Sequence, residues 1–203
     1  MGLRSIFELI LCAVLPIVIT MILLYASKEH KLSDSLKYKI FAGIILGIVA
    51  IFNTELGATV MNGAIVNTRD AAALCAGLCF GLPGGIVAGL IGGIERVLAA
   101  FVWGSAGTYT VWACAISTML CGLVAGILHE TLLKKDKKIT FLGGFIIGLC
   151  GEIVHLGLIA LFKLNDIANA MDVIRSLAIP QIICNALAVG LTILFLNRLN
   201  KES

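Results

Sequence analysis

Long apolar runs separated by short polar segments make up almost the whole chain. The runs are continuous and cover residues 6–25, 38–52, 70–101, 109–128, 139–164 and 177–196. Most of them have the length that a helix needs to cross about 30 Å of hydrocarbon. They lack the two-residue alternation that is typical of strands in a transmembrane barrel. The pattern therefore predicts an all-α polytopic membrane protein.

The run at 70–101 is too long for one simple crossing and carries a ladder of glycines. Glycine recurs at every fourth position, at Gly77, Gly81, Gly85, Gly89 and Gly93. On a helix this spacing leaves a strip of bare backbone against which a neighbouring helix can pack closely. The Pro83-Gly84-Gly85 sequence near the middle predicts a turn, so we expect a helical hairpin or a re-entrant element. Residues 53–68 have no helical stripe, and we expect them to be irregular or partly re-entrant.

Two lysine clusters predict the orientation in the membrane. The first cluster follows the first run, the second follows the fourth run, and the chain ends in a third basic segment: Lys28, Lys31, Lys37 and Lys39; Lys134, Lys135, Lys137 and Lys138; Arg198 and Lys201. Cytoplasmic loops collect Lys and Arg, so we expect all three segments and the C-terminus inside. An even number of crossings must separate the two clusters, so the hairpin crosses twice or not at all. This predicts a bundle of five to seven segments, with the N-terminus outside if there are seven.

The composition excludes a soluble domain and gives little sign of other chemistry. Of 203 residues, 60% are hydrophobic and 13% are charged, about half the charged fraction of a soluble domain. We expect one transmembrane domain over residues 1–203, with no soluble output domain. The net charge of +3 is explained by the lysine clusters, so no nucleic-acid partner is expected. The seven cysteines form no Cys-x-x-Cys or His/Cys cluster, and we expect no metal, cofactor or disulfide.

Two arginines bracket the glycine ladder and form the first candidate site. Arg69 and Arg96 are each adjacent to an acid, Asp70 and Glu95. Guanidinium groups are costly in an apolar segment, and their donor fork matches a carboxylate. The hypothesis is that they bind a small anion. Asn67 is included in this ligand-binding set, either as the residue that holds the loop presenting Arg69 or as a direct contact to the ligand. The alternative is that both pairs are interfacial anchors whose side chains reach the headgroups.

Cys114 and Ser117 follow the ladder at positions i and i+3, so they share a helix face. Ser117 could donate a hydrogen bond to a keto or carboxylate oxygen, and Cys114 could do so weakly. Packing of two small residues against the glycine strip explains the same spacing equally well.

Glu152 and His155 also share a helix face, in the middle of an apolar run. They could form a proton relay or a pH-sensitive switch, since His titrates near neutrality. The favoured interpretation is a polar pair that holds helices together. We expect Gln181 and Asn185, in the last run, to form hydrogen bonds between helices.

Taken in order, these pieces resemble the LytS-type five-transmembrane receptor domain. That domain is the membrane sensor module of bacterial LytS-like histidine kinases, including those that respond to pyruvate and similar small carboxylates. The matching pieces are Asn67-Thr-Arg69, Gly81-x-Pro-Gly-Gly, Gly92-Gly-Ile-x-Arg96, Ala113-Cys114-Ala-Ile-Ser117-Thr, Glu152-x-x-His155 and Ile179-Pro180…Asn185-Ala. They cover most of residues 52–199. The resemblance implies that Arg69, Arg96, Cys114 and Ser117 bind the ligand, although Glu95 stands where the family often has His.

The resemblance also implies a function and a set of partners. The chain would be the receptor module of a two-component sensor histidine kinase in a bacterial cytoplasmic membrane, binding an extracellular carboxylate such as pyruvate. Its partners would be the lipid bilayer, a cytoplasmic kinase or other output domain, fused or separate, and a second copy in a homodimer. The main alternative is a free-standing substrate-binding membrane subunit of a vitamin-type transporter. A membrane enzyme that uses Glu152 and His155 is a third hypothesis.

Overall fold

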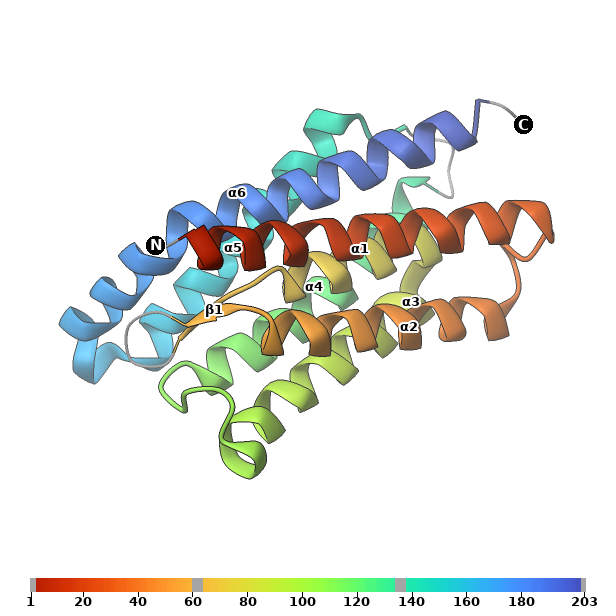
Figure 1. The fold of residues 1–203 in the computed structure, drawn as a ribbon. Helices are drawn as coiled ribbons and strands as arrows, with labels where there is room; N and C mark the ends of the chain where they lie inside the picture. The colour runs from red at the N-terminus through yellow and green to blue at the C-terminus, as the bar shows by residue number, and fades with distance from the viewer. Residues whose placement is uncertain (1–2, 60–63, 134–137, 202–203) are drawn as a thin grey trace.

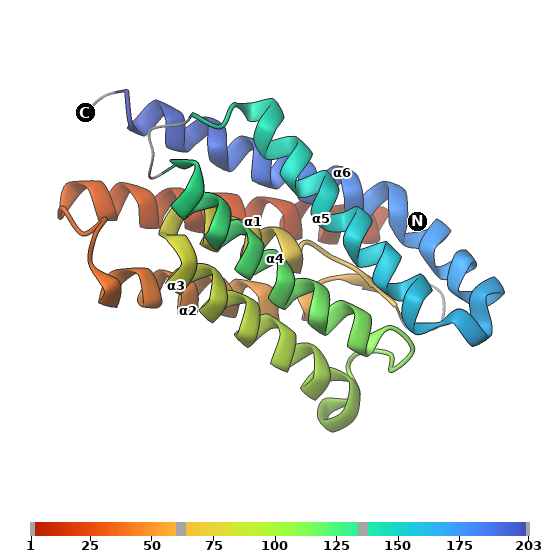
Figure 2. The ribbon, with the colours of Figure 1, turned by 180° about the vertical axis from the view of Figure 1, so that it is seen from behind.

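The protein is a bundle of long helices, seen from opposite sides in Figures 1 and 2. We analysed a computed structural model, which describes residues 3–59, 64–133 and 138–201. The elements in chain order are α1 (Leu3–Glu29), α2 (Leu36–Glu55), β1 (Ala58–Thr59), β2 (Ile65–Val66), α3 (Arg69–Leu98), the π-helical turn η2 (Ala99–Trp103), α4 (Val111–Thr131), α5 (Phe141–Phe162), the 3₁₀ turn η4 (Leu164–Asp166) and α6 (Ile167–Leu199). Within these described residues, six helices are long and apolar enough to cross a membrane. The predicted all-α polytopic membrane class is confirmed.

Helix α3 is folded back on itself into a hairpin. Gly81 has φ 72° and ψ −168°, which interrupts the helix between residues 69–80 and 82–98. A Cβ placed on Gly84 would lie 3.1 Å from the carbonyl oxygen of Ala76, and one on Gly85 would lie 2.8 Å from the Cα of Gly77. Residues eight positions apart can meet in this way only if the two arms run antiparallel. The predicted hairpin is present, and it divides α3 into two arms, residues 69–80 and 82–98.

The turn of the hairpin lies at Gly81, and the prediction of a turn at Pro83-Gly84-Gly85 is wrong by a few residues. A positive φ is accessible to glycine without steric cost, whereas proline is restricted to negative φ. Pro83 instead occupies the first turn of the second arm, where its missing N–H removes no helical hydrogen bond. The glycine therefore makes the reversal, and the proline begins the next helix.

The first arm of α3 enters the bundle partway along its length. Residues 69–80 span about 18 Å, less than the roughly 30 Å of a hydrocarbon core. The antiparallel pair β1–β2, with Ala58 opposite Val66, leads the chain to this starting point (Figure 1). The segment 53–68 was predicted to be irregular or partly re-entrant. It contains the end of α2 and the two strands of this pair. Residues 60–63, between the strands, lie outside the described part. Residues 71–76 are all buried, as expected of a helix that is apolar on every side.

Glycines allow α3 and α4 to approach at backbone distance. A Cβ on Gly77 would lie 2.6 Å from the backbone nitrogen of Gly126, and one on Gly89 would lie 3.0 Å from the carbonyl oxygen of Thr118. The backbones of Gly85 and Gly122 leave no room for a side chain on either residue. The glycines of the ladder therefore allow the two arms of α3 to pack closely against α4 of the same chain.

One end of the bundle gathers the basic residues. The Nζ of Lys28 donates to the carbonyl oxygen of Leu199 at 2.8 Å, so the C-terminal ends of α1 and α6 lie together. His129, near the end of α4, lies 2.7 Å from the carbonyl oxygen of Leu78 beside the hairpin tip. Of the second predicted lysine cluster, Lys134, Lys135 and Lys137 lie outside the described residues. We refer to this end as the basic end and to the other as the opposite end.

Helix α6 includes a polar stretch that the sequence pattern assigned to a break. Asp172 and Arg175 form an exposed ion pair of 3.1 Å one helical turn apart. Ala170, Val173 and Leu177 are buried on the other face. The spacing of three and four residues is that of an amphipathic helix, so the expectation that the last helix begins near residue 177 is wrong.

Candidate functional site

Asparagines hold the start of α3 inside the bundle. The Oδ1 of Asn67 accepts from the backbone nitrogen of Arg69 at 3.1 Å, and the Oδ1 of Asn185 accepts from that of Ala71 at 2.8 Å. Asn185 also donates to the carbonyl oxygen of Asn67 at 3.1 Å. These bonds satisfy N–H groups that have no partner within the first helical turn. The expected roles of Asn67 as a loop holder and Asn185 as a link between helices agree with these contacts.

The Arg69 guanidinium is buried between hydroxyl groups that connect it to two acids. Its Nε donates to the Oγ1 of Thr118 at 2.9 Å and its Nη1 to the Oγ1 of Thr54 at 3.1 Å. Thr118 lies 2.5 Å from the Oδ1 of Asp70, and Thr54 donates to the Oε2 of Glu95 at 2.9 Å. Only 1% of Arg69 is exposed. The positive charge is therefore balanced inside the bundle, away from the aqueous ends.

Arg96 lies on the second arm of α3 and is held by the loop before α4. Its Nη2 donates to the carbonyl oxygen of Gly107 at 2.7 Å and to the Oγ1 of Thr110 at 3.3 Å. Its Nη1 is buried and has no hydrogen-bond partner among the described residues. The guanidinium lies near the Cys114 side chain. With 1% exposed, Arg96 retains one unused donor next to a thiol.

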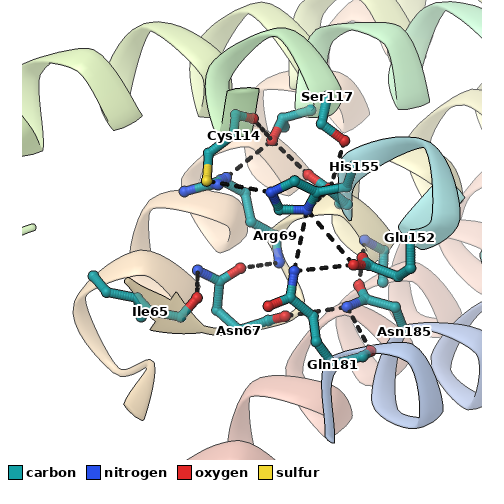
Figure 3. A network of polar contacts seen from close by, with 12 residues as sticks. Ile65, Asn67, Arg69, Cys114, Ser117, Glu152, His155, Gln181 and Asn185 are labelled. Atoms are coloured by element: carbon teal, nitrogen blue, oxygen red, sulfur yellow. Dashed lines mark hydrogen bonds and ion pairs between the residues drawn. The ribbon is translucent and has the colours of Figure 1, made fainter. Parts of the chain in front are cut away.

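Cys114 on α4, His155 on α5 and Asp70 on α3 contact one another in that order. Figure 3 shows the side chains of Cys114 and His155 pointing toward each other. The Sγ of Cys114 lies 3.2 Å from the Nε2 of His155. The Nδ1 of His155 lies 3.0 Å from the Oδ2 of Asp70. The hydroxyl of Ser117 donates to that same oxygen at 2.9 Å. The predicted relay histidine thus touches the predicted ligand-binding cysteine.

Glu152 extends this chain toward α6. The Nε2 of Gln181 donates to the Oε2 of Glu152 at 2.9 Å and lies 3.1 Å from the Nδ1 of His155. The donor atoms of Asp70, Glu152 and His155 all lie within 4.8 Å of one another, close enough for a metal ion to join them. The hydrogen bonds to one another and to Gln181 account for this proximity by themselves. The sequence analysis considered only Cys-x-x-Cys and His/Cys spacing, so it did not identify the group of Asp70, Glu152 and His155.

The structure brings all seven predicted site residues into one buried region. Six of them belong to one connected network of polar contacts: Asn67, Arg69, Cys114, Ser117, Glu152 and His155. The seventh, Arg96, lies beside Cys114 and adjoins this network. Both arginines are buried. Sequence reasoning missed Thr54 and Thr118, because a lone threonine in an apolar run carries no signal of its partner.

A small cavity of about 50 Å³ adjoins this region at the opposite end of the bundle. It is lined in part by Thr110, the partner of Arg96, and by Tyr109. The hydroxyl of Tyr109 lies 3.0 Å from the Oδ2 of Asp166, and the Nζ of Lys163 lies 4.3 Å from the Tyr109 ring centre. Desolvation and the neighbouring Asp166 raise the pKa of the Tyr109 phenol. These residues link α4 to the α5–α6 turn above the site.

Comparison with known proteins identifies relatives of the chain. The family model described as 5TMR of 5TMR-LYT matches residues 21–199. The sensor protein LytS of Staphylococcus epidermidis is 28% identical over 165 residues, which cover 74% of this chain and 27% of that protein. The sensor histidine kinase BtsS of Escherichia coli K12 is 25% identical over 159 residues, 77% of this chain and 27% of that protein. The chain therefore spans about a quarter of the length of these relatives. No solved structure matches it.

Proposed function

The chain belongs to the 5TMR-LYT family and is a membrane sensor module, and from this premise we propose that it binds a small carboxylate such as pyruvate between Arg69, Arg96, Cys114 and Ser117. Two guanidinium groups, each 1% exposed, lie in one polar region, and this observation carries the proposal. A positive charge buried at this depth is costly unless negative groups balance it, and a bound carboxylate is a group of that kind. The carboxylate would enter between the α3 hairpin and α4.

The unused donor of Arg96 gives the ligand a source of binding energy. A buried donor without a partner costs about 1–3 kcal/mol, and more when it is charged. A carboxylate oxygen at Nη1 removes that cost and adds a charge-assisted hydrogen bond. Asp70 and Glu95 supply negative charge while no ligand is bound, so the site is stable in both forms.

The same network offers a route for the signal. From Cys114 on α4 the contacts continue through His155 on α5 to Gln181 on α6. Helix α6 runs from this site to Leu199 at the basic end. A ligand that separates α3 from α4 would shift these contacts, provided that it binds the two helix arrangements with different affinity.

The proposed orientation and partners follow from the same elements. The basic end would be cytoplasmic, because Lys and Arg collect on that side, and the opposite end with its small cavity would face outward. The relatives named as sensor proteins are about four times longer than the matched segment. We therefore propose that a cytoplasmic kinase or other output domain, fused or separate, receives the signal from α6, in a homodimer.

Calorimetric titration of the purified protein tests the carboxylate site. The panel consists of pyruvate, lactate, acetate, succinate and a neutral vitamin. We expect carboxylate affinity to fall at least about tenfold in Arg69→Ala and Arg96→Ala, a change of roughly 1.4 kcal/mol. Arg175→Ala is the matched control, because the Arg175 side chain is 74% exposed and paired only at the surface.

Two results would reject the proposal, the first its binding site and the second its ligand class. Unchanged carboxylate affinity in both arginine variants would mean that the arginines are structural anchors. Binding of the neutral vitamin alone would favour the substrate-binding subunit of a transporter.

A further inference from the structure

The Cys114–His155–Asp70 chain has the arrangement of an activated thiol nucleophile. We propose that Cys114 binds a 2-oxo acid by a reversible covalent bond, as a hemithioketal at the keto carbon. This inference rests on the proposed carboxylate site and adds to it a chemical step that selects the keto group. The three residues come from α4, α5 and α3 and are all buried, so their relative positions are determined by the packed bundle.

The hydrogen bonds of His155 orient its ring for this role. The Oδ2 of Asp70 lies 3.0 Å from Nδ1 and also accepts from the Ser117 hydroxyl. A carboxylate oxygen can only accept, so it favours the tautomer that carries the proton on Nδ1. The Nε2 atom then presents a lone pair to the Cys114 thiol at 3.2 Å. Cys114 as the nucleophile, His155 as the base and Asp70 as the group that orients the base thus lie next to one another in that order.

The proposed step is an addition in which no atom is oxidised or reduced. The S–H proton of Cys114 moves to Nε2 of His155 as the sulfur attacks the keto carbon. The S–C bond forms, and the π electrons of the C=O bond move to its oxygen. That oxygen then takes the proton back from Nε2, which leaves a neutral hydroxyl. The reverse sequence releases the intact 2-oxo acid.

Arg96 supplies the group that this step needs at the developing oxygen. Its unpartnered Nη1 lies on the guanidinium that approaches Cys114. A donor held in place where negative charge develops stabilises the addition, and positive charge near the sulfur favours the thiolate. Other buried thiols have different neighbours: Cys75 lies 3.4 Å from the Thr192 hydroxyl and Cys12 lies 3.9 Å from a backbone carbonyl.

Carbon-13 NMR of pyruvate labelled at C2, added to the full chain in detergent, tests the proposal. We expect a tetrahedral C2 resonance in the parent that is absent from Cys114→Ala and Cys114→Ser. Free pyruvate hydrate also has a tetrahedral carbon, but it appears in every sample and is removed by subtraction. Cys121→Ala is the matched control, since Cys121 is a buried thiol on the same helix. We also expect pyruvate to bind the parent at least about tenfold tighter than lactate, and Cys114→Ala to lose this preference for the keto acid.

The outcomes separate this inference from the proposed function. Pyruvate that binds with C2 still trigonal would overturn the covalent step and leave the carboxylate site intact. A tetrahedral signal that persists in both Cys114 variants would overturn the assignment to Cys114. If no carboxylate binds the parent, both the covalent step and the receptor site are rejected.

Discussion

Substitution of Gly85 by alanine tests the hairpin on which the site depends. The added Cβ would lie 2.8 Å from the Cα of Gly77 and would overlap the carbonyl oxygen of Gly122. Carbon atoms normally approach to about 3.5–4.0 Å, so the first arm and α4 must both move away by up to about 1 Å. Both neighbours are backbone atoms, which no rotamer change can displace. Overpacking of this kind costs about 1–3 kcal/mol.

Gly157→Ala is the matched control for this substitution. Gly157 also lies within a helix, but a Cβ there would meet nothing within 4 Å. It reports the gain of up to about 1 kcal/mol that alanine brings to a helix. We expect Gly85→Ala to be less stable than Gly157→Ala by about 1–3 kcal/mol.

Thermal unfolding in detergent, followed by tryptophan fluorescence, measures the difference. For a chain of this size it corresponds to a lower Tm by about 2–12 °C. If the two variants unfold at the same temperature, then Gly85 does not face Gly77 and Gly122. The antiparallel hairpin would then be wrong, and with it the proximity of Arg69 and Arg96.

Three further substitutions test the network and the orientation. Asn185→Leu leaves the backbone nitrogen of Ala71, in the first turn of α3, without its partner and should lower the free energy of unfolding by about 1–3 kcal/mol. Asn197→Ala is the control: it loses one half-buried hydrogen bond and should lower that free energy by less. An equal decrease in the two variants would contradict the capping role of Asn185. Thr118→Val preserves shape but removes the acceptor of the Arg69 Nε, so carboxylate affinity should change by about tenfold or more in calorimetry; unchanged affinity would separate Arg69 from the ligand. A membrane-impermeant maleimide on intact cells should label Thr108→Cys and spare Lys31→Cys, because the basic end is expected inside; the opposite labelling would invert the proposed topology.

Much of the architecture could be predicted from the chain alone. Apolar runs of membrane length predict spanning helices. The lysine-rich segments between them predict which end of the bundle is cytoplasmic. The four-residue spacing of the glycines predicted close helix packing, and the requirement for an even number of crossings predicted the hairpin. The last apolar run covers residues 177–196, whereas α6 begins at Ile167. Asp172 and Arg175 interrupt the apolar pattern, and only the fold shows that the other face of this segment is buried.

The site itself was decided by the tertiary structure. The sequence contains Arg69, Cys114 and His155 as separate signals on different helices, and no local pattern says that a cysteine on α4 faces a histidine on α5. Thr54 and Thr118 carry no signal at all. Their roles arise because buried charges must find hydrogen-bond partners wherever the packed helices provide them. The positions of the helices follow from the order of apolar and polar residues, so the sequence determines them. The partners of the buried polar side chains lie on other helices, so only the packing of those helices determines the site.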